Sequence, residues 1–177
     1  MKRIWLTGAS SGIGAALAEE LLRAGHRLAL SARSTGPLQT LAARYGDQVL
    51  VAPGDLTDAE QVRAIGERIA QQWGALDCAI LNAGTCEYVE VRQFEAAMIE
   101  RVVNANLFSA SYCIEAALPL LRRGERPHLV GVGSSVTFMP LPRAEAYGAS
   151  KAAMRYLMQT LRIDLAAEGI DVTLVSP

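Results

Sequence analysis

The stretch Thr7–Gly14, TGASSGIG, joins an apolar run, Arg3–Thr7, to an amphipathic run, Gly12–Ala24, and it decides how the chain folds. The first run predicts a strand, and the second, with apolar residues on one side, predicts a helix. A helix N-terminus offers unpaired N–H groups and a partial positive charge, and glycine lets a phosphate come close to the backbone. The spacing Gly-x-x-x-Gly-x-Gly therefore predicts a phosphate-binding turn, with a tight turn lacking any ligand as the alternative.

The rest of the chain repeats this alternation of short apolar runs and longer amphipathic runs. The predicted strands are Arg3–Thr7, Arg27–Ala32, Gln48–Ala52, Leu76–Leu81, His128–Gly133 and Asp171–Ser176. The predicted helices are Gly12–Ala24, Leu38–Tyr45, Asp58–Gln72 with Thr57 or Asp58 as its cap, Phe94–Arg122 with a kink or break, and Ala146–Glu168. This pattern predicts an α/β fold of the Rossmann type: a doubly wound parallel sheet in the order 3-2-1-4-5-6, with three α/β/α layers in a single domain, 1–177.

Composition narrows the class of function. The 177 residues are 51% hydrophobic with a net charge of −1, which predicts a globular protein with no basic surface for nucleic acid. No apolar run is long enough to predict a membrane span. The three cysteines, Cys78, Cys86 and Cys113, are odd in number and lack metal-type spacing, so we expect no metal site and a reducing, cytoplasmic location. Because the sequence stops directly after a predicted strand, we expect the natural protein to continue past Pro177.

A tyrosine and a lysine, Tyr147 and Lys151, stand four positions apart at the start of the last predicted helix. Positions four apart share one helix face, so both side chains can point into the same cleft. A phenol has a reference pKa of about 10, and a nearby ammonium lowers it by favouring the phenolate. The pair therefore predicts an acid/base that exchanges a proton with a substrate oxygen. Ser134 precedes the tyrosine by thirteen positions, and Ser135 is an alternative because neighbouring strand residues point in opposite directions.

These motifs together resemble the classical short-chain dehydrogenases/reductases over essentially the whole chain. The matching stretches are the glycine turn at Thr7–Gly14, Asn-Ala-Gly at Asn82–Gly84, and the serine, tyrosine and lysine just described. The resemblance implies that the turn holds a dinucleotide through Gly8, Gly12 and Gly14 and the backbone at Ser10, Ser11 and Ile13. It further implies that Asp55, beside Leu56, contacts the adenine and that Asn82, Ala83 and Gly84 support the cofactor.

The same resemblance implies a catalytic set. Tyr147 is expected to be the acid/base, Lys151 to bond the nicotinamide ribose as well, and Ser134 to position the substrate oxygen. Asn106 is expected to open a helix kink and to hold a water in a proton relay with the lysine; Asn104 competes on sequence alone, but the spacing from Asn82 favours Asn106. Relatives pair through their long helices, which implies a homodimer or homotetramer.

The end of the second predicted strand indicates which dinucleotide is used. Sites that prefer NAD place a carboxylate about 20 residues after the glycines, for the ribose 2′-hydroxyl. Here that neighbourhood holds Ala32 and Arg33 and no acid. Arginine can bind a 2′-phosphate by charge-assisted hydrogen bonds, so the sequence predicts NADP(H) in preference to NAD(H). Ser31 and Ser34 are candidate further contacts, and a merely solvated Arg33 is the alternative.

The expected activity is therefore reversible hydride transfer between NADP(H) and a small-molecule carbonyl/alcohol substrate. One alternative is a catalytically inactive dinucleotide-binding regulator, against which the complete set Asn106, Ser134, Tyr147 and Lys151 argues. Another is a Rossmann-like methyltransferase, which leaves the tyrosine–lysine pair and Arg33 unexplained.

Overall fold

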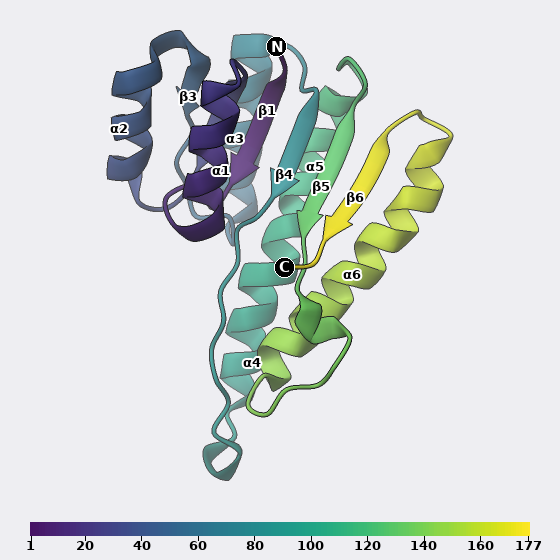
Figure 1. Cartoon of the computed structure of the whole chain (residues 1–177). Coiled ribbons are helices and arrows are strands. Elements are labelled where there is room, and N and C mark those ends of the chain that lie inside the picture. The colour runs from purple at the N-terminus through teal and green to yellow at the C-terminus, as the bar shows by residue number, and fades with distance from the viewer.

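The computed structural model describes all residues, 1–177, and builds one six-stranded parallel sheet covered by helices (Figure 1). The strands are β1 (Arg3–Thr7), β2 (Arg27–Ser31), β3 (Val49–Val51), β4 (Cys78–Leu81), β5 (His128–Val132) and β6 (Asp171–Val175). The helices are α1 (Gly12–Arg23), α2 (Thr35–Tyr45), α3 (Ala59–Trp73), α4 (Ala96–Val103), α5 (Ser109–Leu121) and α6 (Glu145–Ala166). The strand order is β3-β2-β1-β4-β5-β6, so the predicted fold class and strand order are confirmed.

The sheet is buried on both faces, which gives the molecule three layers. Within β1, Trp5 points to the core under α3, α5 and α6, whereas Leu6 points to the core under α1 and α2. Successive strand residues face opposite sides, so one strand supplies both cores, and such strands read as continuous apolar runs. Figure 1 shows α4 and the start of α6 extending past the carboxyl ends of the strands.

Some element boundaries differ from those predicted. Helix α2 begins at Thr35 rather than Leu38, because Gly36 and Pro37 lie in its first turn, where proline's missing N–H costs no hydrogen bond. Strand β4 begins at Cys78 rather than Leu76, whose N–H donates to the carbonyl of Leu120 instead of a neighbouring strand. A short 3₁₀ turn, Val91–Gln93, precedes α4, which starts at Ala96 rather than Phe94.

The predicted kink or break in the long helical region is a π-helical turn, Asn104–Phe108, between α4 and α5. An extra residue per turn bulges the backbone and re-aims the side chains there, a feature frequent at functional sites. It turns Asn106 into the protein, where its side chain is buried.

Candidate active site

A cavity of about 630 Å³ opens at the carboxyl ends of the central strands, between the glycine turn and the π-helical turn. Eleven residues predicted for the cofactor line it: Gly8, Ser10, Ser11, Gly12, Ile13, Arg33, Asp55, Leu56, Asn82, Ala83 and Gly84. Further lining comes from Ala32, Gly54, Thr57, Thr85, Glu87, Arg101, Asn104, Ala105 and Ser109. Ligands of doubly wound sheets bind at this edge, where the strand order reverses, so the cavity lies where the fold predicts a site.

Close packing requires glycine at two positions of the turn, Gly8 and Gly14. Gly8 has a φ of +66°, and a Cβ there would lie 2.8 Å from the Ala83 Cα. A Cβ on Gly14 would overlap the carbonyl oxygen of Gly8. Gly14 is absent from the cavity lining, so its place in the motif follows from how α1 packs on the turn.

The N-terminus of α1 meets the cavity without a side-chain cap. Ser11 occupies the N-cap position, yet its hydroxyl makes no capping hydrogen bond, and the first turn holds no acidic residue. Helix α3 differs, because its Asp58 carboxylate accepts hydrogen bonds from the N–H groups of Glu60 and Gln61, as predicted for the cap. The free first-turn N–H groups of α1 fit an anionic ligand, such as the pyrophosphate of a dinucleotide.

Asp55 and Arg33 both line the cavity. The Asp55 carboxylate accepts hydrogen bonds from the Thr57 N–H (3.0 Å) and hydroxyl (2.8 Å). These hydrogen bonds from Thr57 lower the pKa of Asp55, and the positive charge of Arg33 lowers it further. The arginine is exposed, with no ion pair inside the chain.

The candidate contact at Ser31 is wrong. Ser31 is fully buried, accepts a hydrogen bond from Trp5 Nε1 (2.9 Å) and donates one to the carbonyl of Ala52 (2.7 Å). Alternation along β2 turns its hydroxyl to the face of the sheet that Trp5 occupies, away from the cavity. Ser34, at the N-cap of α2, is exposed.

Thr7 and Asn82 tie β1 to β4 beneath the cavity. The Thr7 hydroxyl accepts hydrogen bonds from the N–H groups of Asn82 (2.9 Å) and Ala83 (3.1 Å). The Asn82 amide donates to the carbonyls of Thr7 (3.1 Å) and Gly8 (3.2 Å). In the sequence Thr7 was identified only as the first residue of the motif. Its position at the end of a strand, beside the turn, was the available signal for this bridge.

Tyr147 and Lys151 lie together at the start of α6. The Lys151 ammonium is 5.8 Å from the centre of the Tyr147 ring and donates a hydrogen bond to the carbonyl of Val132 (2.8 Å). Lys151 is only 6% exposed, and this burial lowers the pKa of its ammonium group. A Cβ on Gly84 would lie 3.6 Å from the Lys151 Nζ, so the lysine reaches the cavity wall.

Asn106 connects the π-helical turn to α6. Its amide donates to the Thr85 carbonyl (2.9 Å) and the Ser150 hydroxyl (2.9 Å), and its oxygen accepts from the Thr85 N–H (2.7 Å). The Ser150 hydroxyl in turn donates to the carbonyl of Tyr147 (2.8 Å). Sequence reasoning missed Ser150, because its partner Asn106 is 44 positions away in the sequence. Asn104 instead lines the cavity.

The two serines after β5 have different surroundings. Ser134 is half-buried and its hydroxyl accepts a hydrogen bond from the Val136 N–H (3.3 Å), whereas Ser135 is exposed. The hydrogen bonds of Asn106 and Ser150 and the closeness of Lys151 to Tyr147 connect these four residues, whereas the hydrogen bond of the Ser134 hydroxyl is local.

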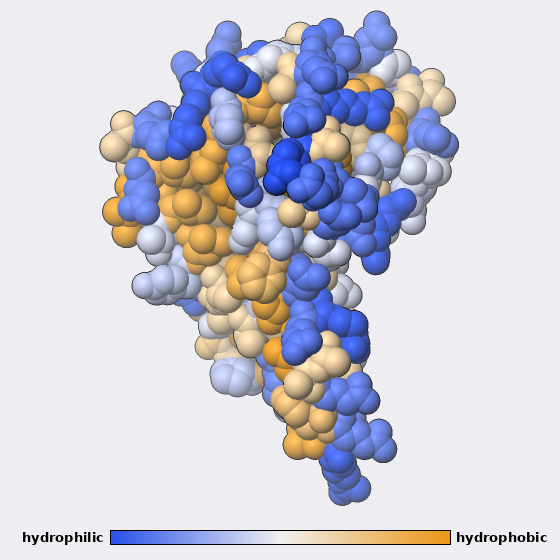
Figure 2. All heavy atoms as spheres, turned by 180° about the vertical axis from the view of Figure 1, so that it is seen from behind, coloured by the Kyte–Doolittle hydropathy of each residue, from blue (hydrophilic) through white to orange (hydrophobic).

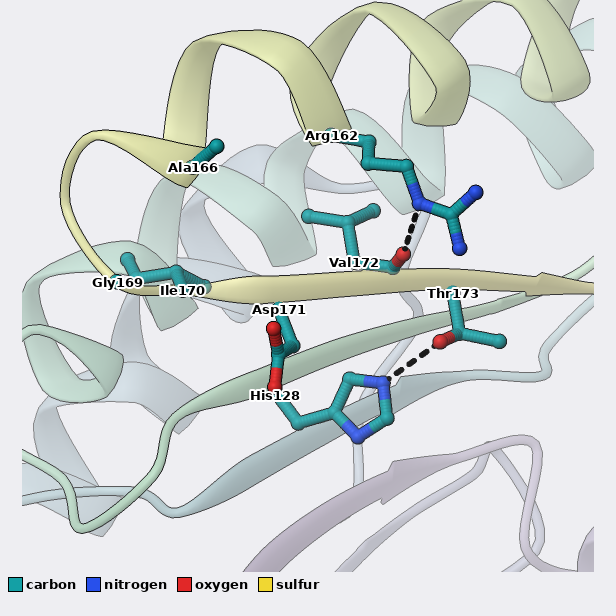
Figure 3. A pocket seen from close by; sticks show the side chains of 8 residues that line it. All are labelled: His128, Arg162, Ala166, Gly169, Ile170, Asp171, Val172 and Thr173. Carbon is teal, nitrogen blue, oxygen red and sulfur yellow. Dashed lines mark hydrogen bonds between the residues drawn. The ribbon is translucent and has the colours of Figure 1, made fainter.

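A second cavity, of about 310 Å³, lies at the opposite ends of β5 and β6 (Figure 3). There His128 Nε2 and the Thr173 hydroxyl are 2.8 Å apart, and Arg162 Nε donates to the Val172 carbonyl of β6 (2.9 Å). Arg162 thereby satisfies a backbone oxygen at the edge of the sheet. None of the predicted site residues lines this cavity.

No helix combines the length and apolar character needed to cross a membrane. No cluster of histidine, cysteine and acidic side chains has a geometry that could hold a metal ion. Cys78 and Cys113 are buried and Cys86 is exposed, all with free thiols.

The fold and the cavity at its switch point define a Rossmann-type α/β protein. The family model described as short chain dehydrogenase matches residues 2–177. The chain therefore belongs to the short-chain dehydrogenase family, whose members are oxidoreductases that use NAD(P) on CH–OH/C=O groups.

Relatives and solved structures agree with this family. An uncharacterized oxidoreductase of Staphylococcus aureus is 32% identical over 97% of this chain and 75% of its own length. The 11-beta-hydroxysteroid dehydrogenase A of Sesamum indicum is 35% identical over 99% of this chain and 51% of its own length. A short-chain dehydrogenase from Streptomyces avermitilis superposes with a TM-score of 0.93 at 29% identity, over 99% of this chain and 65% of that one.

A structure from Pseudomonas aeruginosa, described as an RhlG/NADP active-site complex, superposes with a TM-score of 0.92 at 31% identity. The alignment covers 99% of this chain and 72% of that one. The chain thus spans between about half and three quarters of the length of these relatives.

Proposed function

We propose that the chain catalyses reversible hydride transfer between NADP(H) and a small-molecule carbonyl/alcohol pair, with Tyr147 as the acid/base. The observation that carries the proposal is the buried Lys151 ammonium, 5.8 Å from the Tyr147 ring and beside Gly84 at the wall of the large cavity. The pair places a proton-bearing hydroxyl and a positive charge side by side, which is the arrangement that proton exchange with a substrate oxygen requires.

Each remaining catalytic residue has a proposed part. Asn106 fixes the start of α6 through Ser150 and the Tyr147 carbonyl, which holds the tyrosine and the lysine in one place. Ser134 positions the substrate oxygen, with Ser135 as the alternative. Lys151 has hydrogen-bonding capacity left after its bond to Val132, because an ammonium has three donors.

The proposed cofactor site is the row of residues from the glycine turn to Gly84. The uncapped N-terminus of α1 receives the pyrophosphate, Asp55 and Leu56 receive the adenine, and Arg33 receives the 2′-phosphate that distinguishes NADP(H) from NAD(H). The cofactor supplies the hydride chemistry when bound, and the protein supplies orientation and the proton. The NADP complex of the Pseudomonas aeruginosa relative supports the choice.

The experiment that tests the function is oxidation of NADPH in the presence of benzaldehyde, cyclohexanone or an aliphatic 3-ketoester. We expect turnover with at least one of the three, faster with NADPH than with NADH at equal concentration. Binding of NADPH without any turnover would support an inactive dinucleotide-binding regulator. Absence of both binding and turnover would contradict the proposal.

We also propose a cytoplasmic location, which is consistent with three free thiols, and a homodimer or homotetramer, because members of the family are commonly oligomeric.

A further inference from the structure

The segment Thr85–Val89 begins shortly after β4, lines the large cavity at Thr85 and Glu87, and is held by three different elements. The side chain of Asn106, in the π-helical turn, forms hydrogen bonds with both the N–H and the carbonyl of Thr85. Arg101 of α4 pairs with Glu87 (3.0 Å) at the cavity wall. The third contact, at Val89, comes from Arg143 in the loop before α6 and has no part in the proposed mechanism.

Arg143 and Val89 exchange a pair of hydrogen bonds. The Val89 N–H donates to the Arg143 carbonyl (2.9 Å), and Arg143 Nε donates to the Val89 carbonyl (3.4 Å). The Arg143 guanidinium also lies 5.4 Å from the centre of the Tyr88 ring, a cation–π distance. One side chain therefore binds two neighbouring residues of the segment.

The backbone of Arg143 is held in an uncommon conformation. Its φ is +64°, in the left-handed region that residues with a Cβ rarely adopt. Such a conformation persists where the surroundings fix it, and here the surroundings are Tyr88 and Val89. The one other non-glycine residue with a positive φ is Arg126, at +50°, before β5 at the opposite end of the sheet.

The start of α6 lies directly beside this contact. Residue Ala144 at the N-cap position has no side chain that can cap the helix. Ala146 is fully buried in a small core with Val89 and Val102, separate from the two main cores. Val89 is therefore joined to α6 on both sides of its first residue, through Arg143 and through Ala146, and Tyr147 follows directly.

We propose that Arg143 is a positioning residue: by joining Tyr88 and Val89 to the beginning of α6, it sets the position of Tyr147 beside Lys151. The inference rests on the proposed function for its effect on rate, but its structural part stands without it. A shift of about 1 Å in a reacting group can lower a rate about a hundredfold, so loss of the contact lowers kcat.

Three variants distinguish the effect of the Arg143 side chain from that of its backbone conformation: Arg143→Ala, Arg143→Gly and Arg143→Lys. We expect Arg143→Ala to lower kcat about tenfold to a hundredfold, with the Kd for NADPH within about twofold of wild type. Glycine permits the positive φ but lacks the side chain, so it stays impaired, whereas lysine keeps a cation over Tyr88 and recovers part of the rate. Arg126→Ala is the matched control and keeps the wild-type rate.

Hydrogen exchange provides a readout that needs no activity. Amides of the peptide Glu145–Lys151 are expected to exchange about tenfold faster in Arg143→Ala than in wild type or Arg126→Ala, because the first turn opens more often. Unchanged exchange in that peptide would overturn the inference, as would full activity in Arg143→Gly. If wild type turns over none of the three carbonyl probes, the proposed function fails, and the exchange result alone decides the positioning role.

Discussion

Asp77 is a single carboxylate that joins three segments at the amino ends of the strands. It accepts hydrogen bonds from the Arg3 N–H (2.8 Å), from the Arg3 guanidinium (2.8 Å) and from the Glu125 N–H (2.7 Å). Burial alone raises the pKa of Asp77, but the hydrogen bonds from Arg3 and Glu125 outweigh it and lower the pKa to about 2. The ionised form therefore stabilises the folded state.

Asp77→Asn should lower the free energy of unfolding by about 2 kcal/mol at pH 7. Because the folded pKa of about 2 lies below the unfolded value of about 3.9, this stabilisation is full above about pH 5 and is lost progressively as the pH falls through 2. Urea denaturation at pH 7 and pH 3 measures the difference. Asp164→Asn, at an exposed site of α6, is the control, and equal losses for both variants would contradict the account.

Arg33→Ala tests the cofactor preference. Removing a charge-assisted contact to the 2′-phosphate should weaken the binding of NADPH about tenfold to a hundredfold and leave the binding of NADH nearly unchanged. Fluorescence titration with each nucleotide gives both Kd values. Arg44→Ala, which breaks an ion pair with Glu19 outside the cavity, serves as the control. An equal loss of affinity for both nucleotides would show that Arg33 does not bind the 2′-phosphate.

At the residue scale the sequence is sufficient to locate the side chains whose placement depends on local spacing. The glycine turn and the pair Tyr147 and Lys151 need only one turn or one helix to be recognised. Ser31 was misplaced because its face of the strand depends on the register of the sheet. Ser150 and Arg143 were missed because their partners, Asn106 and Val89, are distant in the sequence.

At the scale of elements, the helices and strands follow from apolar periodicity, whereas their ends follow from tertiary contacts. Helix α2 takes in Gly36 and Pro37, which look like a turn in sequence but lie at a helix start. The break in the long helical region was expected, but its form as a π-helical turn depends on Asn106 binding Thr85.

Gly14→Ala tests the packing of α1 on the glycine turn. A Cβ would overlap the Gly8 carbonyl, so we expect a loss of about 2 kcal/mol or more in the free energy of unfolding. Gly36→Ala is the matched control: a Cβ there meets open space in the first turn of α2, and alanine favours a helix by up to about 1 kcal/mol. Thermal and urea unfolding compare the two, and a stable Gly14→Ala variant would contradict the proposed packing.

For the whole molecule, fold class and strand order were predictable because alternating strands and helices allow few arrangements. The association of chains follows from surface shape, which a single sequence does not display. Figure 2 shows hydrophobic side chains gathered over the face formed by α5 and α6. By their exposed fractions, Tyr156 and Ile163 of α6 are each 75% exposed, and Phe108, directly before α5, is 49% exposed.

We expect a molar mass of twice or four times 18.9 kDa in light scattering coupled to size exclusion. Ile163→Glu should shift the mass towards the monomer, because a charge buried in an apolar interface is costly. Leu141→Glu, at an exposed site outside α5 and α6, should leave the mass unchanged. A monomeric wild-type protein would contradict the proposed assembly.

The most direct test of the account compares Tyr147→Phe with Tyr156→Phe in NADPH-dependent reduction of the best carbonyl probe. Both variants remove one hydroxyl from α6, but Tyr156 is exposed and far along the helix from the cavity. We predict that Tyr147→Phe lowers kcat about a hundredfold or more while the Kd for NADPH stays near wild type, and that Tyr156→Phe keeps the wild-type kcat. Equal kcat values for the two variants would contradict the assignment of Tyr147 as the proton donor.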